Sequence, residues 1–379
     1  MQRTLLASCA IFSAIALSAA HAQVTRVSVA SGAWSNSALW NPPGVPAADD
    51  DVVISQTTTI TIATTTPNLG QVHIKGSLTN AANSNLELRA NRIEVLSGGL
   101  LQIGTQTVRY LGNARVALLD TANGAGYETA SLIVHPQGTI ELHGEDRGLP
   151  WTTLSQSTPA LPNDTSTTTP GFALLNTAVT WRKGDSVALV SNDFYRPYTT
   201  LPDPTVAEFV LPTSFTVGGT RMNFPESLQR QHFAALDRGV SMFAEVALMN
   251  RNIVVAGNGG DNRGHVMFRG TSQNTTTPSG PVVHISWTRF ENLGKNGQLG
   301  RYPVHFHLNG DAPSAGRNSV RNCVVAHSQN RSYVIHGTND VDLVGNIAYD
   351  IVGHSFYLED GTETGNLIEG NLGFGTRAG

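Results

Sequence analysis

Three short segments near the C-terminal end of the sequence combine β-forming residues with histidines and carboxylates. They are residues 301–311 (RYPVHFHLNGD), 332–340 (SYVIHGTND) and 353–363 (GHSFYLEDGTE). Imidazoles and carboxylates that share one surface can transfer protons or bind a metal ion. Hydrogen-bonded polar residues at strand ends would have the same composition, and residue type and spacing alone favour neither interpretation.

The first segment indicates which side chains could act together. Side chains alternate between the two faces of a β-strand. Val304, Phe306 and Leu308 are therefore expected to point into a core. His305 and His307 are then expected to share the opposite, solvent-facing side.

The other two segments repeat this alternation. Ile335 and Leu358 are expected inside, and His336 and Glu359 outside. A shift of one residue in register would bury every one of these polar groups, which is costly. Stacking of the segments would produce one outward column with flanking polar residues: His307, His336 and Glu359 in the column, His305 beside it, and Asp311 and Asp360 in the adjoining turns.

A repeat in the same region predicts how the segments stack. Asn322, Asn346 and Asn371 each lie between apolar residues, in three copies of one turn-and-strand unit. A period of roughly 20–50 residues is typical of a solenoid. With β-forming runs and asparagines at the corners, the pattern predicts a right-handed parallel β-helix whose asparagines stack. An antiparallel sandwich would not need this periodicity.

The rest of the chain favours an all-β protein. Thr, Ser, Asn and Gly are abundant and punctuate short β-forming runs, as turns with positive φ require. Cys9 lies in the N-terminal apolar run and Cys323 in the run Cys-Val-Val, so we expect no intrachain disulfide. Cys323 is expected in the core rather than as a nucleophile.

The first 22 residues have the pattern of a secretory signal peptide. A basic start precedes an apolar run over residues 5–19 and the sequence Ala-His-Ala at residues 20–22. Cleavage after Ala22 would leave a secreted, periplasmic or cell-surface protein. No later apolar run approaches the length of a membrane span.

The charge distribution points to an anionic partner. The formal net charge is −4, which argues against nucleic-acid binding. Residues 215–340 nevertheless carry a balance of +5. A basic middle on an acidic chain suits a groove for an anionic polymer, although a chance fluctuation in surface charge explains it about as well.

An ordered string of motifs resembles a known family. The motifs include WSNSALW, GVPAADDDVVI, GTIELHG, WRKGDSVALVSNDF, AEVALMNRNIVVAG, GRYPVHFHLNGD and GHSFYLEDGTETGN. They resemble the eight-glycine-domain and β-helix family that includes the cell migration-inducing and hyaluronan-binding protein and the cell surface hyaluronidase (transmembrane protein 2). The resemblance implies an eight-glycine domain at 31–155, a Ser/Thr/Pro-rich loop at 156–171 and a parallel β-helix at 172–379. That β-helix is expected to be incomplete at its C-terminal end.

The resemblance also implies binding and depolymerisation of hyaluronan or a related uronic-acid polysaccharide. Hydrolysis of a glycosidic bond needs an acid and a base or nucleophile. We expect catalysis from Glu359, Asp360, His307 and His336, and substrate binding by Arg301, His305, Asp311 and His354. His265 and His327 are weaker candidates, and His327 is expected to be structural. The alternatives are a β-helical lyase on another uronate polymer and a non-catalytic carbohydrate-binding or adhesive protein.

The sequence leaves the metal question open. His305, His307 and His336 with a carboxylate would suit a transition-metal ion. The family's hyaluronan-degrading members are linked with calcium, but calcium prefers oxygen ligands. The histidines therefore argue against a calcium site at this position.

Overall fold

The computed structural model describes residues 23–121, 126–158, 171–192, 206–216, 218–225, 227–258, 263–271 and 278–378. The predicted signal peptide lies outside these residues, as does most of the predicted loop at 156–171. Within them there is no α-helix, and no helix is long and apolar enough to cross a membrane. One 3₁₀-helix, η1 (Ser37–Leu39), precedes the short strand β3 (Trp40–Asn41), which pairs antiparallel with β1.

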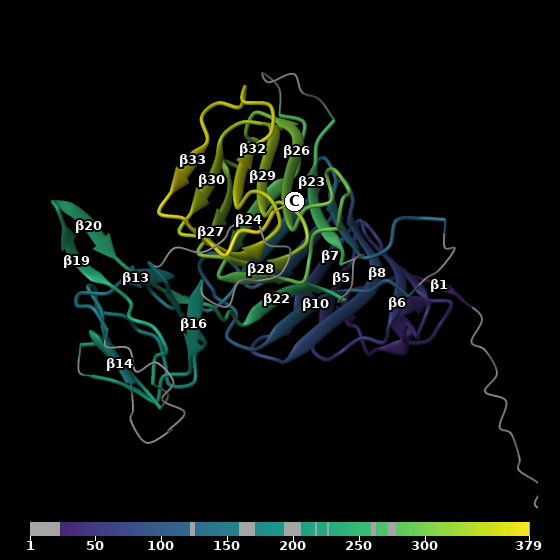
Figure 1. The fold of residues 1–379 in the computed structure, drawn as a ribbon. Helices are drawn as coiled ribbons and strands as arrows, with labels where there is room; N and C mark the ends of the chain where they lie inside the picture. Colours follow the sequence, from purple (N-terminus) through teal and green to yellow (C-terminus); the bar gives the residue numbers. More distant parts are fainter. Residues whose placement is uncertain are drawn as a thin grey trace, which may run out of the picture.

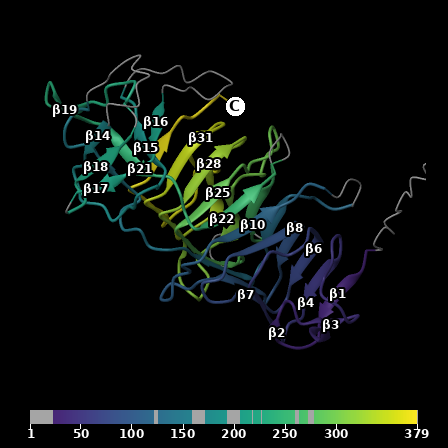
Figure 2. The same ribbon diagram turned by 90° about the horizontal axis from the view of Figure 1, so that it is seen from below.

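Parallel strands stacked along one axis form a solenoid with three faces (Figures 1 and 2). The first face contains β1 (Thr25–Ser28), β4 (Asp51–Ile54), β6 (Leu69–Ile74), β8 (Leu86–Val95), β11 (Ser131–Val134), β23 (His265–Arg269), β26 (Val304–Gly310), β29 (Tyr333–Thr338) and β32 (Phe356–Leu358). The second contains β2 (Gly32–Ala33), β5 (Thr59–Ile62), β7 (Ser77–Asn80), β9 (Leu100–Ile103), β12 (Thr139–His143), β24 (Val282–Ser286), β27 (Asn318–Arg321), β30 (Val341–Val344) and β33 (Leu367–Glu369). The third contains β10 (Ala114–Leu118), β22 (Ile253–Gly257), β25 (Thr288–Glu291), β28 (Val324–Ser328), β31 (Ile347–Ile351) and β34 (Leu372–Phe374).

One hydrophobic core runs through the solenoid, from Trp34 to Ile351. The predicted all-β fold and parallel β-helix are confirmed, but the helix does not begin near residue 172. Parallel pairing is present from β1 onward, and β10 and β12 continue in register into β22 and β24. The region expected to be a separate β-rich domain therefore forms the first coils of the same solenoid.

An antiparallel insert interrupts the solenoid between β12 and β22, and Figures 1 and 2 show it to one side of the coils. Its strands are β13 (Trp151–Thr153), β14 (Gly171–Leu174), β15 (Val187–Val190), β16 (Ala207–Val210), β17 (Ser214–Phe215), β18 (Arg221–Phe224), β19 (Ala234–Asp237), β20 (Val240–Phe243) and β21 (Glu245–Leu248). All of their pairings are antiparallel. The expectation of a parallel β-helix over 172–248 is therefore wrong. These strands pair with one another and pack around a second core that includes Trp181 and Phe224.

Asparagines at one corner hold successive coils together, as the repeat predicts. The Oδ1 atom of Asn346 accepts from the Cys323 amide at 2.9 Å, and its Nδ2 donates to the Val320 carbonyl at 2.9 Å. Asn371 accepts from the Asn346 amide at 2.8 Å. Asn322, with φ of 55°, lies at this corner one coil earlier but opposite Gly345, so it is one residue out of register with the stacked pair Asn346 and Asn371. The side chains of Asn346 and Asn371 thus satisfy backbone groups that a tight corner leaves unpaired.

Candidate functional site

The predicted column lies on the first face, where β26, β29 and β32 run side by side (Figure 1). His307 lies opposite His336 in register, and their Nδ1 atoms are 3.1 Å apart. Glu359 directly follows β32, and its Oε2 is 3.8 Å from the Nδ1 of His336. The structure therefore brings His307, His336 and Glu359 within reach of one another.

The inward residues follow the predicted alternation only as far as Phe306. Val304 and Phe306 are fully buried. Leu308 has a φ of 55°, and the pairing register shifts between His307 and Gly310. Leu308 is therefore half-buried, and Asn309 is buried in its place. The expectation that Leu308 points into the core is wrong, because an irregularity in β26 reorients the chain.

His305 lies beside the column but is not exposed to solvent. Its exposed fraction is 0 %, because residues 300–302 cover it. Its Nδ1 is 3.0 Å from the Gly300 carbonyl, and its ring packs 4.8 Å from that of Tyr302. The expectation of a solvent-facing His305 is therefore wrong. Its Nε2 is also buried and has no hydrogen-bond partner among the described residues.

Burial makes these imidazoles weak bases. Burial lowers the pKa of His305 well below its ordinary value, and the neighbouring His307 lowers it further. Burial and the neighbouring His336 lower the pKa of His307 to about 4. Both rings are therefore neutral near pH 7, and a neutral imidazole keeps one ring nitrogen with a free lone pair.

Two residues that the sequence analysis did not single out position Glu359. The Tyr302 hydroxyl donates to Glu359 Oε1 at 3.4 Å, and Arg331 Nη1 donates to the Tyr302 oxygen at 2.8 Å. Glu359 Oε2 is buried and accepts no hydrogen bond from a described residue. One carboxylate oxygen is thus held, and the other faces the histidines. Tyr302 lies near the start of the first segment and Arg331 directly precedes the second, which was the only available signal in the sequence.

Asp360 joins the site from the other side of His336. Its Oδ2 is 3.5 Å from His336 Nε2, the ring nitrogen that does not face His307. Glu363 accepts from the backbone amides of Asp360 and Gly337, at 3.0 and 3.1 Å. Glu363 therefore fixes the turn that carries Asp360 against β29.

Arg301 lies in an ion-pair cluster that the sequence did not reveal. Its Nε donates to Glu128 Oε1 at 2.6 Å, and Lys295 Nζ lies 3.1 Å from the same oxygen. His265 is 3.7 Å from it, and burial lowers the pKa of His265 to about 3. Glu128 thus holds Arg301 next to the column. Binding of a substrate carboxylate by Arg301 stays a prediction.

Ion pairs neutralise part of the basic middle of the chain. Arg317 and Arg321 both bind Asp342, for example. Arg269 is exposed, and no ion pair involves it among the described residues. It lies opposite His307 in the pairing of β23 with β26. Arg269 therefore adds a cation at one end of the column.

Comparisons with known proteins divide the chain in two. A G8 domain model matches residues 34–155, and a CEMIP β-helix model matches residues 262–379. The chain therefore contains one segment similar to G8 domains and one segment similar to the CEMIP β-helix. The G8 domain therefore corresponds to the first coils of the solenoid, and the CEMIP β-helix carries the histidine column.

Several relatives match over most of this chain. A Dictyostelium discoideum protein is 29 % identical over 91 % of the chain, and human fibrocystin-L is 28 % identical over 90 %. Human cell surface hyaluronidase CEMIP2 is 32 % identical over 54 %. The chain spans only 33 %, 9 % and 15 % of the lengths of these relatives, respectively.

A surface cavity of about 480 Å³ lies in the CEMIP β-helix, and it is linked to the column by Arg331 although no column residue lines it. Residues 296–299, 329–331 and 352–354 line it. Arg331 connects this cavity to Glu359 through the Tyr302 hydroxyl. His354, predicted to bind substrate, is exposed at the cavity and stacks on Tyr357 at 4.7 Å. A ligand in this cavity would therefore contact Arg331, which is two hydrogen bonds away from the Glu359 carboxylate.

A second cavity, of about 280 Å³, lies where the insert meets the solenoid. Its lining includes Arg147 and Arg182, which are ion-paired with Asp185 and Glu145. None of the column residues lines it. The chemistry of the column is therefore the better guide to the site.

Two predicted candidates have partners outside the column. Asp311 accepts from Asn339 Nδ2 at 2.9 Å, at the end of β26. His327 lies on the third face, where its Nδ1 is 2.8 Å from Asp350 Oδ2. The structural interpretation of His327 agrees with this ion pair, and a substrate-binding role for Asp311 stays a prediction.

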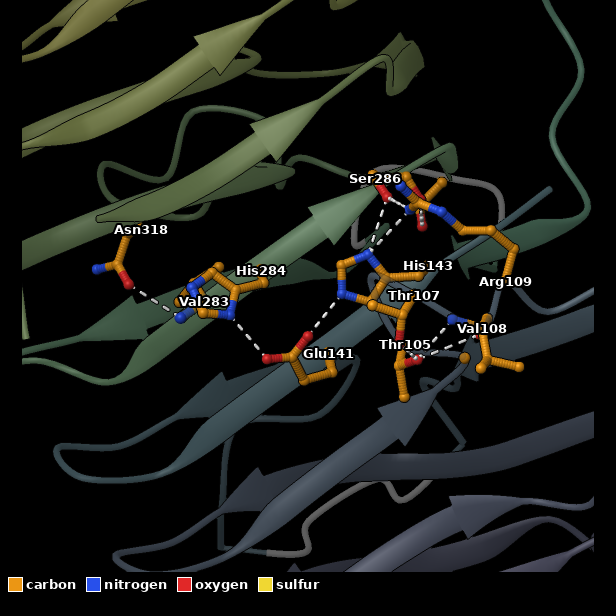
Figure 3. Close-up of polar contacts among 12 residues, drawn as sticks. Thr105, Thr107, Val108, Arg109, Glu141, His143, Val283, His284, Ser286 and Asn318 are labelled. Carbon is orange, nitrogen blue, oxygen red and sulfur yellow. Dashed lines mark hydrogen bonds and ion pairs between the residues drawn. The ribbon is translucent and has the colours of Figure 1, made fainter. Parts of the chain in front are cut away.

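A polar cluster on the second face joins the G8 domain to the CEMIP β-helix (Figure 3). Glu141 accepts from His143 Nε2 at 2.6 Å and from His284 Nδ1 at 2.7 Å. The Ser286 Oγ is 2.9 Å from His143 Nδ1, so the order Ser–His–Glu resembles a nucleophilic triad. Arg109, however, donates to both Ser286 Oγ and His143 Nδ1. His143 Nδ1 would have to take the serine proton, but it already accepts a hydrogen bond from Arg109. The cluster is therefore a hydrogen-bond network whose members bind one another.

Glu141→Gln is expected to reduce the acid sensitivity of the fold. Burial raises the pKa of Glu141, but hydrogen bonds from His143 and His284 outweigh burial and lower the pKa from 4.5 to about 2. A carboxyl group whose pKa is lowered in the folded state stabilises the fold at pH values above its pKa in the unfolded chain. This contribution, on the order of 3 kcal/mol, is lost as the pH falls from about 4.5 toward 2. Urea unfolding between pH 7 and pH 3 would measure the difference.

The matched control is Glu369→Gln, an exposed residue on the same face. Its unfolding free energy should fall with acid as steeply as that of the unsubstituted protein, and that of Glu141→Gln should fall less. An equal decrease of unfolding free energy with acid in all three proteins would show that Glu141 does not contribute to the acid sensitivity of the fold.

Proposed function

We propose that this chain binds hyaluronan or a related uronic-acid polysaccharide and depolymerises it by hydrolysing glycosidic bonds. The observation that carries the proposal is the grouping of two carboxylates with three imidazoles, near a surface cavity. The name of the relative CEMIP2, a cell surface hyaluronidase, supports the substrate class.

Glu359 and Asp360 are the proposed acid–base residues. The Tyr302 hydroxyl orients Glu359 and leaves its second oxygen available for proton transfer. Asp360 orients the imidazole of His336 from the opposite ring nitrogen. General acid–base catalysis requires such groups within hydrogen-bond reach of the reacting atoms. His307 and His336 would then position the sugar or take part in proton transfer.

Cations at the rim would recognise the polymer. Hyaluronan carries one carboxylate per disaccharide, and a planar guanidinium binds a carboxylate through two hydrogen bonds. Arg269 and Arg301 lie close enough to His307 to lower its pKa. Arg331 and His354 line the adjoining cavity. The proposed substrate path therefore runs from the cavity across the column.

Incubation of the purified protein with a panel of uronate polymers tests the proposal, with and without a chelator. New reducing ends without ultraviolet absorbance are expected. A product that absorbs through a 4,5-unsaturated uronate would instead identify a lyase. Binding without fragmentation would identify a carbohydrate-binding protein. Calcium-dependent cleavage would fit the ion that the family implies, but the nitrogen-rich column would not be its site.

The proposed place of action is outside the cytoplasm. The N-terminal 22 residues have the pattern of a signal peptide, and CEMIP2 is by name a cell-surface protein. We expect the exported protein to begin at Gln23. N-terminal sequencing of protein recovered from the periplasm, cell surface or medium would measure this, and intact Met1 on cytoplasmic protein would contradict it.

A further inference from the structure

Three imidazoles converge at the column in a way that the proposed hydrolysis does not require. His305 and His307 come from β26, and His336 comes from β29. One ring nitrogen from each lies within 4.8 Å of the other two. His307 and His336 even present the same kind of atom, Nδ1, to each other at 3.1 Å. A hydrogen bond between these two atoms requires that one Nδ1 donates and the other accepts, whereas a metal ion could bind both nitrogens as acceptors.

His305 supplies the second observation. Its Nδ1 is bound to the Gly300 carbonyl, a contact in which only the ring nitrogen can donate. That contact fixes the tautomer, so Nε2 must be the bare acceptor. This atom is buried in a residue with no exposed surface and has no described partner. A buried acceptor with nothing to accept is costly unless a ligand reaches it.

The neighbours of the rings support the same arrangement. A histidine that binds a metal ion usually donates its other ring N–H to a carbonyl or carboxylate. Gly300 does this for His305, and Asp360 lies 3.5 Å from the Nε2 of His336. Glu359 Oε2 faces the cluster without a hydrogen bond. It could accept from a water molecule bound at an open position.

We propose that His305, His307 and His336 form a binding site for one divalent transition-metal ion, with zinc as the best match. Three imidazole nitrogens with an open fourth position suit zinc and related ions, and calcium and magnesium prefer oxygen ligands. The inference concerns metal binding and stands independently of the substrate proposed above.

Titration of the chelator-treated protein with Zn²⁺ and Co²⁺ tests the inference. We expect one equivalent of Zn²⁺ to bind, and bound Co²⁺ to show the visible absorption of low-coordinate cobalt with nitrogen ligands. Loss of a residue that merely supports a ligand weakens metal binding by about 10–100-fold. His307→Gln and His336→Gln should therefore each weaken it by at least about 100-fold. Circular dichroism would verify that both variants are folded.

The control is His354→Ala, which removes an exposed histidine outside the cluster. It should bind Zn²⁺ as tightly as the unsubstituted protein. Equal Zn²⁺ affinity in His307→Gln, His336→Gln and the unsubstituted protein would overturn the inference. So would the absence of a one-equivalent site. Because the readout is metal binding, a protein that binds zinc but cleaves no polymer would contradict only the proposed function.

Discussion

We expect Glu359→Gln to lower the proposed turnover of uronate polymer by roughly 10²–10⁴-fold, the usual contribution of an acid–base group. This is the largest effect expected of any substitution in the site. Glutamine keeps the shape of the side chain and can still accept from the Tyr302 hydroxyl. It cannot exchange a proton at the oxygen that faces His336. Turnover should therefore fall, and polymer binding and the unfolding midpoint should change little.

Reducing-end assays with the purified variant would measure the effect, with Glu369→Gln as the exposed control. Binding would be followed separately with a fluorescent polymer. If the column is only structural, Glu359→Gln should shift the melting temperature by a few degrees at most and leave any activity intact. Full activity in both Glu359→Gln and His307→Ala would favour a non-catalytic role for this surface.

Phe306→Ala is expected to cost about 3–5 kcal/mol of stability, the usual range for a fully buried phenylalanine. Phe306 has no exposed surface and packs 4.9 Å from Phe268 on the preceding coil. It lies between His305 and His307 in sequence, on the opposite face of β26. Truncation would therefore leave a cavity directly behind two residues of the site. Urea unfolding would measure the loss.

Leu358→Ala is the matched comparison, because the sequence predicts the same inward position for both residues. Leu358 does lie opposite the buried Ile335. It is nevertheless 40 % exposed, because β32 is the last strand at its end of the sheet. We expect a loss of less than about 1.5 kcal/mol for this half-covered side chain. Equal losses for the two variants would contradict the described packing.

Local pattern was sufficient to predict the column and the asparagine corners. Period-two alternation fixes which face a side chain takes, and a repeat of similar length stacks equivalent positions. His307, His336 and Glu359 therefore lie together without any need for knowledge of distant contacts. Asn346 and Asn371 bridge coils for the same reason.

Alternation and repeat length could not predict contacts between residues that are far apart in the sequence. Glu128 and Arg301 meet across 173 residues, and no local pattern links them. His305 keeps the predicted side of its strand but is buried, because the segment before the strand folds over it. The insert was expected to be parallel because the family resemblance implied a parallel β-helix from residue 172 onward. Strand direction depends on partners that its short β-forming runs do not specify.

The insert leaves and rejoins the solenoid at one point, since the amide of Glu145 donates to the side chain of Asn252 at 2.8 Å. A loop whose two ends already touch can gain or lose length at little entropic cost, about 0.6 kcal/mol per doubling. The gap between the two family matches falls over this loop. The two matched regions are thus consecutive parts of one solenoid, not separate globular domains joined by a linker. If the chain were cut between the two matched regions, each piece would expose an unpaired edge of the sheet. Exposed sheet edges promote aggregation.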